Sequence, residues 1–337
     1  MTFKSNPHIG RNIAIELVRS TEAAALMSSR WMGRGDKESG DQAAVDALRK
    51  ILNTIDIDGE VVIGEGDKDE APMLFHGERV GSGNGPQVDI AVDPVEGTRL
   101  LANGQPNAIC IIAVAERGAF YRWEDIAYMD KIAVGPRSVG AIDINKSVTE
   151  NLHAVAEKKG MDVRNLTVVV LDRPRHKNLI REIREVGARI RMIQDGDVAG
   201  ALMAAQHDTG IDMLMGIGGA PEAVITAAAL KCIGGEMQAR LWLRNDEERQ
   251  MAEERGIDVE RVFHCDDLVK GNDVNVAVTG LTDGELLEGV KFTSRGAWTQ
   301  SLVLRSASGT YRKIETLHHP SKLDNLDDAM TIPPPVI

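Results

Sequence analysis

The sequence predicts an α/β protein with an N-terminal α+β half and a C-terminal α/β half. Two observations lead to this class. Before residue 145, two helical patterns are followed by a series of short strand patterns, which is the order typical of an α+β domain. After it, strand and helix patterns alternate, which is typical of a mostly parallel sheet. We therefore expect domains at residues 1–145 and 146–320, and a mobile tail at residues 321–337.

Composition excludes several classes of partner. The chain has 337 residues, 43% of them hydrophobic, and a net charge of −12. This charge argues against nucleic acid or an anionic membrane as the main ligand. No apolar run is long enough to span a bilayer, and residues 1–8 have no signal core. The three cysteines are widely spaced, which indicates neither a metal site nor a disulfide framework and favours a cytoplasmic protein.

The first elements are two helices and a short strand. Residues 11–32 have an apolar face and end at Gly33-Arg34-Gly35, and a second apolar stripe follows Asp41. Spacing alone favours Asp41 as the helix N-cap or a first-turn acid. Residues 60–64 then read as a strand that leads into Glu65. Glycines flank this acid, so the backbone can be approached closely and Glu65 is a candidate ligand.

The stretch at residues 88–98 organises the first half. Alternating apolar residues predict a strand that ends at Asp93, because a residue before proline is pushed toward extended conformations. Pro94 and Gly97 then favour a bend. Asp93 and Glu96 could converge there on one hard cation such as magnesium, with the hydroxyl of Thr98 facing the same space. The alternative is an acidic turn with no ligand.

The remaining strands and helices follow from their periodicity. An apolar run at 107–115 and strands at 118–122 and 132–134 indicate an antiparallel meander in the first half. In the second half, strands and helices alternate at these ranges: helix 149–159, strand 166–171, helix 174–186, strand 189–193, helix 198–206, strand 211–215 and helix 222–232. Short strands and an acidic helix at 245–255 follow.

Five acids at predicted element ends form the candidate metal site. They are Asp41, Glu65, Asp93, Glu96 and Glu222. A cluster of acids repels itself, so a bound cation is the natural neutraliser. No set of cysteines and histidines competes, which favours magnesium or manganese over zinc. Two such ions can clamp a phosphate and stabilise its leaving oxygen.

Basic residues supply candidate phosphate ligands. Arg173 and Arg175 bracket Pro174 at a predicted helix start, where they could either be solvated or bind a phosphate. Tyr128 could be a core residue or reach a phosphate, and His176 is expected to be structural or exposed. The glycines at 216–219 lack the Gly-Lys-Ser/Thr ending of a P-loop. We expect a close-packed turn that opens the next helix there.

Several ordered motifs resemble the class II (bacterial) fructose-1,6-bisphosphatases, which belong to the lithium-sensitive sugar and inositol phosphatase superfamily. The resemblance covers residues 10–320. The motifs are Trp31-Met32-Gly33-Arg34-Gly35-Asp36-Lys37, Ile63-Gly64-Glu65-Gly66, Glu70-Ala71-Pro72-Met73-Leu74, Asp93-Pro94-Val95-Glu96-Gly97-Thr98, Arg173-Pro174-Arg175-His176, Asp195-Gly196-Asp197 and Gly216-Ile217-Gly218-Gly219-Ala220-Pro221-Glu222.

The resemblance implies a layered α-β-α-β-α fold and a role for each candidate. It places metal, Mg²⁺ or Mn²⁺, on the five acids named above. It assigns catalysis to Thr98, whose hydroxyl helps to activate the attacking water, with Asp41 and Lys37 nearby. The implied substrate contacts are Glu96, Gly97, Thr98, Tyr128, Arg173, Pro174, Arg175, Asp195, Gly196, Asp197 and Gly219.

The implied activity is metal-dependent hydrolysis of the 1-phosphate of fructose 1,6-bisphosphate, which yields fructose 6-phosphate and phosphate in gluconeogenesis. A dual fructose and sedoheptulose bisphosphatase is the alternative, and an inositol monophosphatase is a weaker one. A catalytically silent phosphosugar or metal sensor would lack a ligand or the hydroxyl, and all are present. The resemblance also implies a homo-oligomer, either a dimer or a tetramer.

Overall fold

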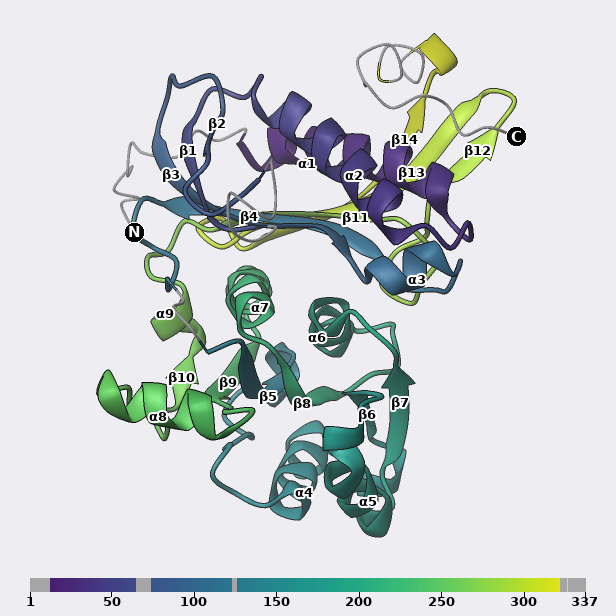
Figure 1. Ribbon diagram of the computed structural model, residues 1–337. Coiled ribbons are helices and arrows are strands. Elements are labelled where there is room, and N and C mark those ends of the chain that lie inside the picture. Colours follow the sequence, from purple (N-terminus) through teal and green to yellow (C-terminus); the bar gives the residue numbers. More distant parts are fainter. Residues whose placement is uncertain (1–12, 65–73, 123–125, 322–325, 327–337) are drawn as a thin grey trace. The chain divides into compact units, whose positions relative to one another are not determined.

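The structure is a computed structural model with two mixed sheets and helices packed on them (Figure 1), so the predicted α/β class is confirmed. It describes residues 13–64, 74–122, 126–321 and 326. The chain groups into two compact units. The first unit holds Met1–Gly118, Asp273–Arg305 and Thr310–Ile337, and the second holds Ala119–Asn272 and Ser306–Gly309.

The sheet of the first unit combines strands from both ends of the chain. Its order is β12-β13-β11-β4-β3-β1-β2, with β14 paired to β13. Its strands are β1 (Asp58–Ile63), β2 (Arg79–Val80), β3 (Gln87–Glu96), β4 (Ile109–Glu116), β11 (Asn275–Gly280), β12 (Lys291–Thr293), β13 (Gly296–Arg305) and β14 (Thr310–His318). β1 and β3 are parallel, so the predicted antiparallel meander is wrong for this pair. The other pairings are antiparallel.

Helices α1 (Ile13–Ser28) and α2 (Lys37–Leu52) lie side by side over one face of this sheet (Figure 1), and the 3₁₀ turn η1 (Ser29–Trp31) joins α1 to the loop before α2. Their apolar stripes are buried: Leu17, Leu26 and Leu48 have no exposed surface. Burying a leucine side chain stabilises a fold by about 1.5–3 kcal/mol. The helical periodicity predicted both helices, because it reflects the apolar faces that supply much of this core.

The N-cap of α2 is Asp36 rather than Asp41, which corrects the sequence prediction. The Ser39 amide donates to Asp36 Oδ1 over 3.0 Å, and Asp36 has the extended backbone of a cap residue. Asp41 lies one turn further into the helix. Its side chain is therefore not needed for capping and remains available for another role.

The second unit has a six-stranded sheet in the order β10-β9-β5-β8-β6-β7. Its strands are β5 (Tyr128–Val134), β6 (Thr167–Leu171), β7 (Arg189–Ile193), β8 (Met213–Gly219), β9 (Glu236–Leu241) and β10 (Phe263–His264). The parallel arrangement predicted from strand and helix alternation holds for β6, β7 and β8. β5, β9 and β10 lie outside the alternating region and pair antiparallel, and β5 inserts between β8 and β9.

The helices of the second unit follow the predicted ranges closely. They are α4 (Val148–Lys159), α5 (Lys177–Val186), α6 (Asp197–Ala205), α7 (Ala220–Ile233), α8 (Asp246–Glu254) and α9 (Cys265–Leu268), with 3₁₀ turns η2 (Pro136–Ser138), η3 (Val163–Asn165) and η4 (Pro174–His176). Ser147 and Glu150 form a capping box at the start of α4, and Gly160 ends it in the left-handed conformation. Among the described residues, no helix combines the length and apolar character that a membrane span requires.

The predicted division after residue 145 lies inside the second unit, between β5 and α4. The two crossings of the chain that bracket residues 119–272 explain the difference. The chain enters the second unit at Ala119 and returns to the first at Asp273, where β11 pairs with β4. Pairing between strands so distant in sequence leaves no local pattern, so a linear boundary could not describe it.

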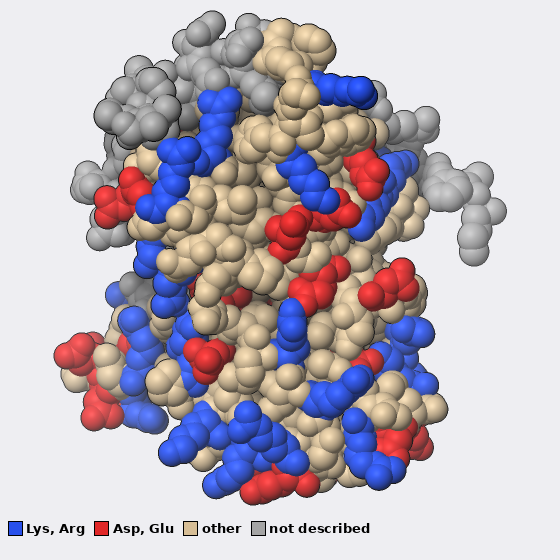
Figure 2. All heavy atoms as spheres, turned by 90° about the vertical axis from the view of Figure 1, so that its right-hand side faces the viewer, with Lys and Arg blue, Asp and Glu red and all other residues tan. Residues whose placement is uncertain are grey.

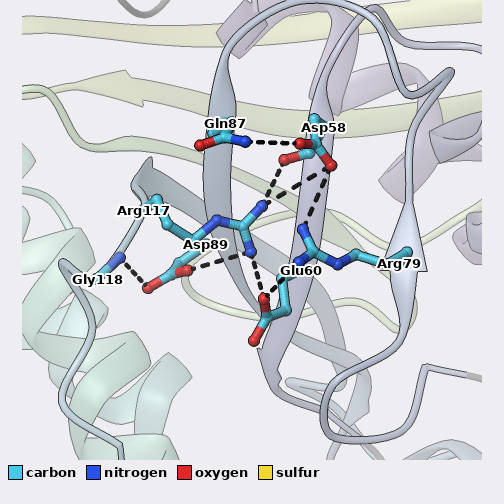
Figure 3. Close-up of polar contacts among 7 residues, drawn as sticks. All are labelled: Asp58, Glu60, Arg79, Gln87, Asp89, Arg117 and Gly118. Atoms are coloured by element: carbon cyan, nitrogen blue, oxygen red, sulfur yellow. Dashed lines mark hydrogen bonds and ion pairs between the residues drawn. The ribbon is translucent and has the colours of Figure 1, made fainter.

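A polar network lies at the ends of β1, β3 and β4, where the chain leaves the first unit (Figure 3). It comprises Asp58, Glu60, Arg79, Gln87, Asp89, Arg117 and Gly118. Arg117 Nη1 lies 2.7 Å from Glu60 Oε2, and its Nη2 donates to the Asp58 carbonyl over 2.7 Å. Asp89 is fully buried and accepts from the Gly118 amide over 2.8 Å. Burying a carboxylate costs free energy unless it has such partners, so Arg117 and Gly118 offset the cost of burying Asp89 on β3.

Candidate active site

The acids predicted at residues 93–98 lie together in the first unit. One carboxylate oxygen of Asp93 and one of Glu96 lie within 4.8 Å of each other. The pairing of β3 with β4 shifts register between these two residues, which leaves Pro94 and Val95 outside the ladder. β3 continues to Glu96, so the prediction that the strand ends at Asp93 is wrong, because a bulge rather than a strand end accommodates Pro94.

Local hydrogen bonds hold this bend in place. The Val95 amide donates to Asp93 Oδ1 over 3.0 Å, and Thr98 Oγ1 donates to the Val95 carbonyl over 3.2 Å. Gly97 has φ of +94°, a conformation that side chains rarely adopt, and it caps the short helix α3 (Thr98–Ala102). The bend therefore fixes two carboxylates and a hydroxyl with few free torsions.

Backbone hydrogen bonds connect the loop before α2 to α3. The amides of Gly33 and Gly35 donate to the carbonyls of Leu101 and Ala102 over 3.0 and 2.8 Å. Lys37 is exposed at the first position of α2, and Asp41 is half-buried one turn later. Burial raises the pKa of Asp41 to about 6. A carboxylate in this range can exchange a proton near neutral pH. Glu65, the remaining predicted ligand of this unit, lies outside the described residues.

A buried ion pair lies beside Glu222 in the second unit. Lys131 Nζ, on β5, lies 2.5 Å from Asp197 Oδ2 and donates to the Gly219 carbonyl over 3.0 Å. Glu222 Oε2 is buried and has no hydrogen-bond partner among the described residues. Burial and the nearby Asp197 carboxylate raise the pKa of Glu222, whereas Lys131 lowers it. A buried carboxylate oxygen without a donor is what a metal ligand would offer.

The glycines before Glu222 lie in a strand rather than in the predicted turn. Gly216 to Gly219 belong to β8 and pair with β5, and α7 begins at Ala220. A Cβ on Gly218 would overlap Asp197 Oδ2, and one on Gly219 would overlap the Glu222 carboxylate. These glycines are therefore needed for space, because two acidic side chains lie over the strand.

The predicted phosphate ligands fall into two groups in the same unit. Arg173 Nη2 lies 3.2 Å from Asp195 Oδ1. The guanidinium carbon of Arg175 lies 5.0 Å from the ring centre of Tyr128, and Arg175 Nη2 donates to the Ile217 carbonyl over 2.9 Å. Both arginines are half-buried. Pro174 opens η4 between them, and Gly196, with φ of +82°, caps α6 just before Asp197.

His176 fixes the segment that carries these arginines. Its Nδ1 lies 2.7 Å from the Leu171 carbonyl, and the Ile217 amide donates to its Nε2 over 2.7 Å. A carbonyl only accepts and an amide only donates, so Nδ1 carries the proton and the ring is neutral. The ring is 1% exposed, so of the two predicted outcomes the structural one is confirmed. It links η4 to β8 at the residue that Arg175 also binds.

We expect the stability contributed by His176 to be lost as the pH falls below about 6.5. Burial, followed by the nearby arginines, lowers the pKa of the folded ring below 6.5, although its bond to Leu171 opposes the shift. The unfolded chain therefore takes up the proton first, and protonation favours unfolding. Above pH 6.5 the ring is neutral in both states and the effect vanishes. Urea unfolding between pH 7.5 and 5 measures it.

His176→Gln serves as the comparison, since glutamine cannot titrate in this range. The free energy of unfolding of this variant should depend less steeply on pH between 6.5 and 5, although its absolute value is lower. Equal slopes for the two proteins would show that His176 takes no part in the pH dependence.

Sequence reasoning missed Lys131 and the role of Gly218. Lys131 stands in a strand pattern beside Ile132, Ala133 and Val134, and a lysine adjoining an apolar run could have been flagged as buried. Its partner Asp197 was identified only through resemblance. The aromatic setting of Tyr128, which includes Trp242 at 6.1 Å between ring centres, had no sequence pattern that revealed it.

Acids that can hold a hard cation, and arginines that can bind a phosphate, are what a metal-dependent phosphatase requires. These groups are typical of that class of enzyme. Residues 11–318 match the family model described as bacterial fructose-1,6-bisphosphatase, glpX-encoded. The chain belongs to this family.

Curated relatives agree with this assignment. The fructose-1,6-bisphosphatase 1 class 2 of Escherichia coli K12 is 43% identical over 335 residues, which cover 96% of this chain and 98% of the relative. The class 2 enzyme of Shigella flexneri matches with the same identity and coverage. A solved structure, the Thermotoga maritima IMPase, is 15% identical with a TM-score of 0.28 over 65% of this chain and 71% of that chain, which carries no weight for the fold.

Proposed function

We propose that this chain hydrolyses the 1-phosphate of fructose 1,6-bisphosphate and releases fructose 6-phosphate and inorganic phosphate. The observation that carries the proposal is the bend in which Asp93, Glu96 and Thr98 are held together in a chain of this family. Two acids and a hydroxyl on one bend provide the ligands and the activating group that phosphate-ester hydrolysis needs. The reaction belongs to gluconeogenesis, and we place the enzyme in the cytoplasm.

The proposed metal ligands are Asp41, Glu65, Asp93, Glu96 and Glu222, and the proposed ion is Mg²⁺ or Mn²⁺. The donor set fits, because every member is a carboxylate and such ions prefer oxygen. Within the first unit, the oxygens of Asp93 and Glu96 are close enough for one ion. Within the second, Glu222 Oε2 is a buried acceptor that has no donor among the described residues. When bound, the ion would polarise the phosphate and lower the pKa of a coordinated water.

Three side chains of the protein are proposed to act on the attacking water, its proton and the phosphoryl charge. Thr98 Oγ1 would orient the attacking water and relay its proton, for which it must give up its bond to the Val95 carbonyl. Asp41 is the proposed acceptor for that proton, through the carboxylate oxygen that it would not give to the metal. Lys37, exposed at the start of α2, would add positive charge beside the phosphoryl group.

The second phosphate of the substrate would bind to the second unit. Arg173 and Arg175 are proposed to hold the 6-phosphate through charge-assisted bonds. Both already have protein partners that fix their direction. The further proposed contacts are Glu96, Gly97, Tyr128, Pro174, Asp195, Gly196, Asp197 and Gly219.

Phosphate release from fructose 1,6-bisphosphate tests the proposal. We expect turnover with Mg²⁺ or Mn²⁺, its loss when a chelator is in excess, and recovery when the ion is restored. Sedoheptulose 1,7-bisphosphate and inositol 1-phosphate should be assayed beside it. A dual bisphosphatase would turn over both bisphosphates at similar kcat/KM. Turnover that persists after complete chelation would contradict the metal assignment, and turnover of inositol 1-phosphate alone would contradict the substrate assignment.

A further inference from the structure

β14 forms a long edge of the sheet in the first unit. It pairs with β13 along all nine of its residues, from Ala297↔His318 to Arg305↔Thr310. β13 uses its opposite side for β11 and β12. Within the described part of the chain, β14 therefore has a strand on one side only. Long edges of this kind are templates for pairing with another chain.

The two faces of β14 differ. Ile314 packs against the core beneath α1, and Thr316 Oγ1 donates to Glu22 of α1 over 2.7 Å, so the even-numbered residues face the helices. Lys313, Glu315 and Leu317 face the other way. Leu317 is 46% exposed, and Trp298, directly opposite it on β13, is 41% exposed. Large apolar side chains exposed side by side on two neighbouring strands mark an interaction surface.

The other edge strands in the described structure have features that disfavour pairing with another chain. β2 and β10 have two residues each and β12 has three, which is too short to recruit a strand. β7, at the edge of the other sheet, carries the exposed side chains of Arg189 and Arg191. Figure 2 shows the many Lys and Arg side chains on the face that includes β7 and α5. Self-pairing of β7 about its midpoint, Arg191, would oppose like charges. β14 also carries exposed charges, at Arg312, Lys313 and Glu315, but it is nine residues long and its midpoint, Ile314, is uncharged.

We propose that β14 pairs antiparallel with β14 of a second copy of this chain, about a two-fold axis at Ile314, and so joins the two sheets into one. Ile314 is the midpoint of the strand, so this register uses all nine residues. Lys313 lies opposite Glu315 of the second copy, and the pair occurs twice by symmetry. Tyr311 likewise lies opposite Leu317, and Ile314 opposite its own counterpart. Opposite charges and apolar pairs across strands stabilise a sheet.

Symmetry leaves few other registers. A two-fold axis normal to the sheet leaves every side chain on the face of the sheet where it already lies. Residues that pair across the axis must therefore be both even-numbered or both odd-numbered, so the axis passes at a residue and not between two residues. Placing it at Lys313 or at Glu315 sets two like charges directly opposite each other. Placing it at Arg312 does the same and pairs fewer residues. Only the axis at Ile314 matches charges and uses the full strand.

Charge reversal tests this interface in the full-length protein by light scattering with size-exclusion chromatography. Wild type should contain an even number of subunits. Lys313→Glu should halve that number, because it opposes Glu315 twice, and should raise the dissociation constant by about tenfold or more. Glu315→Lys should act in the same way. The double variant Lys313→Glu with Glu315→Lys should restore the wild-type assembly, since the pairs are merely inverted.

Two further measurements keep the test decisive. Lys313 is exposed, so its single variant should keep the wild-type Tm within a few degrees. Ile314→Cys should form an intersubunit disulfide under oxidation, whereas Lys313→Cys should not, because only residue 314 faces itself. A monomeric wild type, or an assembly unchanged by Lys313→Glu, would overturn the proposal.

Discussion

Thr98→Ala should lower kcat by about 10²–10⁴-fold, the usual contribution of a positioned proton-transfer group. Thr98 supplies the one side-chain hydroxyl among residues 93–98, and its bond to the Val95 carbonyl fixes its direction. Alanine removes the oxygen and leaves the carboxylates in place. The affinity for Mg²⁺, measured by calorimetry, should therefore change little. A fall in kcat and kcat/KM by the same factor would indicate an interaction made in the transition state.

Thr98→Ser is the matched control. Serine keeps the hydroxyl and can donate to the same carbonyl, so it should retain most of the turnover. A serine variant as slow as the alanine variant would mean that the methyl group and the packing matter instead. Turnover in Thr98→Ala close to that of wild type would refute the role of the hydroxyl.

Local patterns were sufficient for much of the fold. The apolar stripes of α1 and α2 and the alternation of strands and helices in the second half located those elements, because each pattern reports which face is buried. Pairing between distant segments was not accessible. The parallel partnership of β1 with β3, and the return of β11 to β4, depend on contacts that no window of sequence contains. Asp41 was misread as a cap because the apolar stripe begins after it, whereas the helix itself begins at Lys37, directly after its true cap, Asp36.

In the candidate site, too, local features were predictable from the sequence, and contacts between distant segments were not. Asp93, Glu96 and Thr98 were recognisable from the sequence because Pro94 and Gly97 dictate the bend locally. The positions of Arg173 and Arg175 beside a proline-started turn were also readable. The glycines before Glu222 were read as a turn, since glycine is rare in strands. What they make room for is a pair of acidic side chains, and a sequence pattern does not reveal that requirement.

Lys131→Met should lower the free energy of unfolding by about 3–5 kcal/mol, the cost of leaving a buried charge without its partner. The side chains of Lys131 and Asp197 are 1% and 7% exposed, so water cannot replace the missing ammonium group. Loss of Lys131 also removes a positive charge that lowers the pKa of Glu222. If Glu222 is a metal ligand, the Mg²⁺ concentration for half-maximal activity should shift in this variant, because a charge beside the ligand is lost. Urea unfolding and a Mg²⁺ titration of turnover measure the two effects.

Two variants separate the structural effect from the effect on the metal. Lys131→Met with Asp197→Asn removes both charges and should recover part of the lost stability, because no buried charge is left unpaired. Lys159→Met breaks the ion pair with Asp212, elsewhere in the same unit, and should lower stability without changing the Mg²⁺ requirement. If Lys131→Met and Lys159→Met had the same half-maximal Mg²⁺ concentration, Lys131 would support the fold alone. A shift confined to Lys131→Met would make it a positioning residue, acting on the metal through the charge of Glu222.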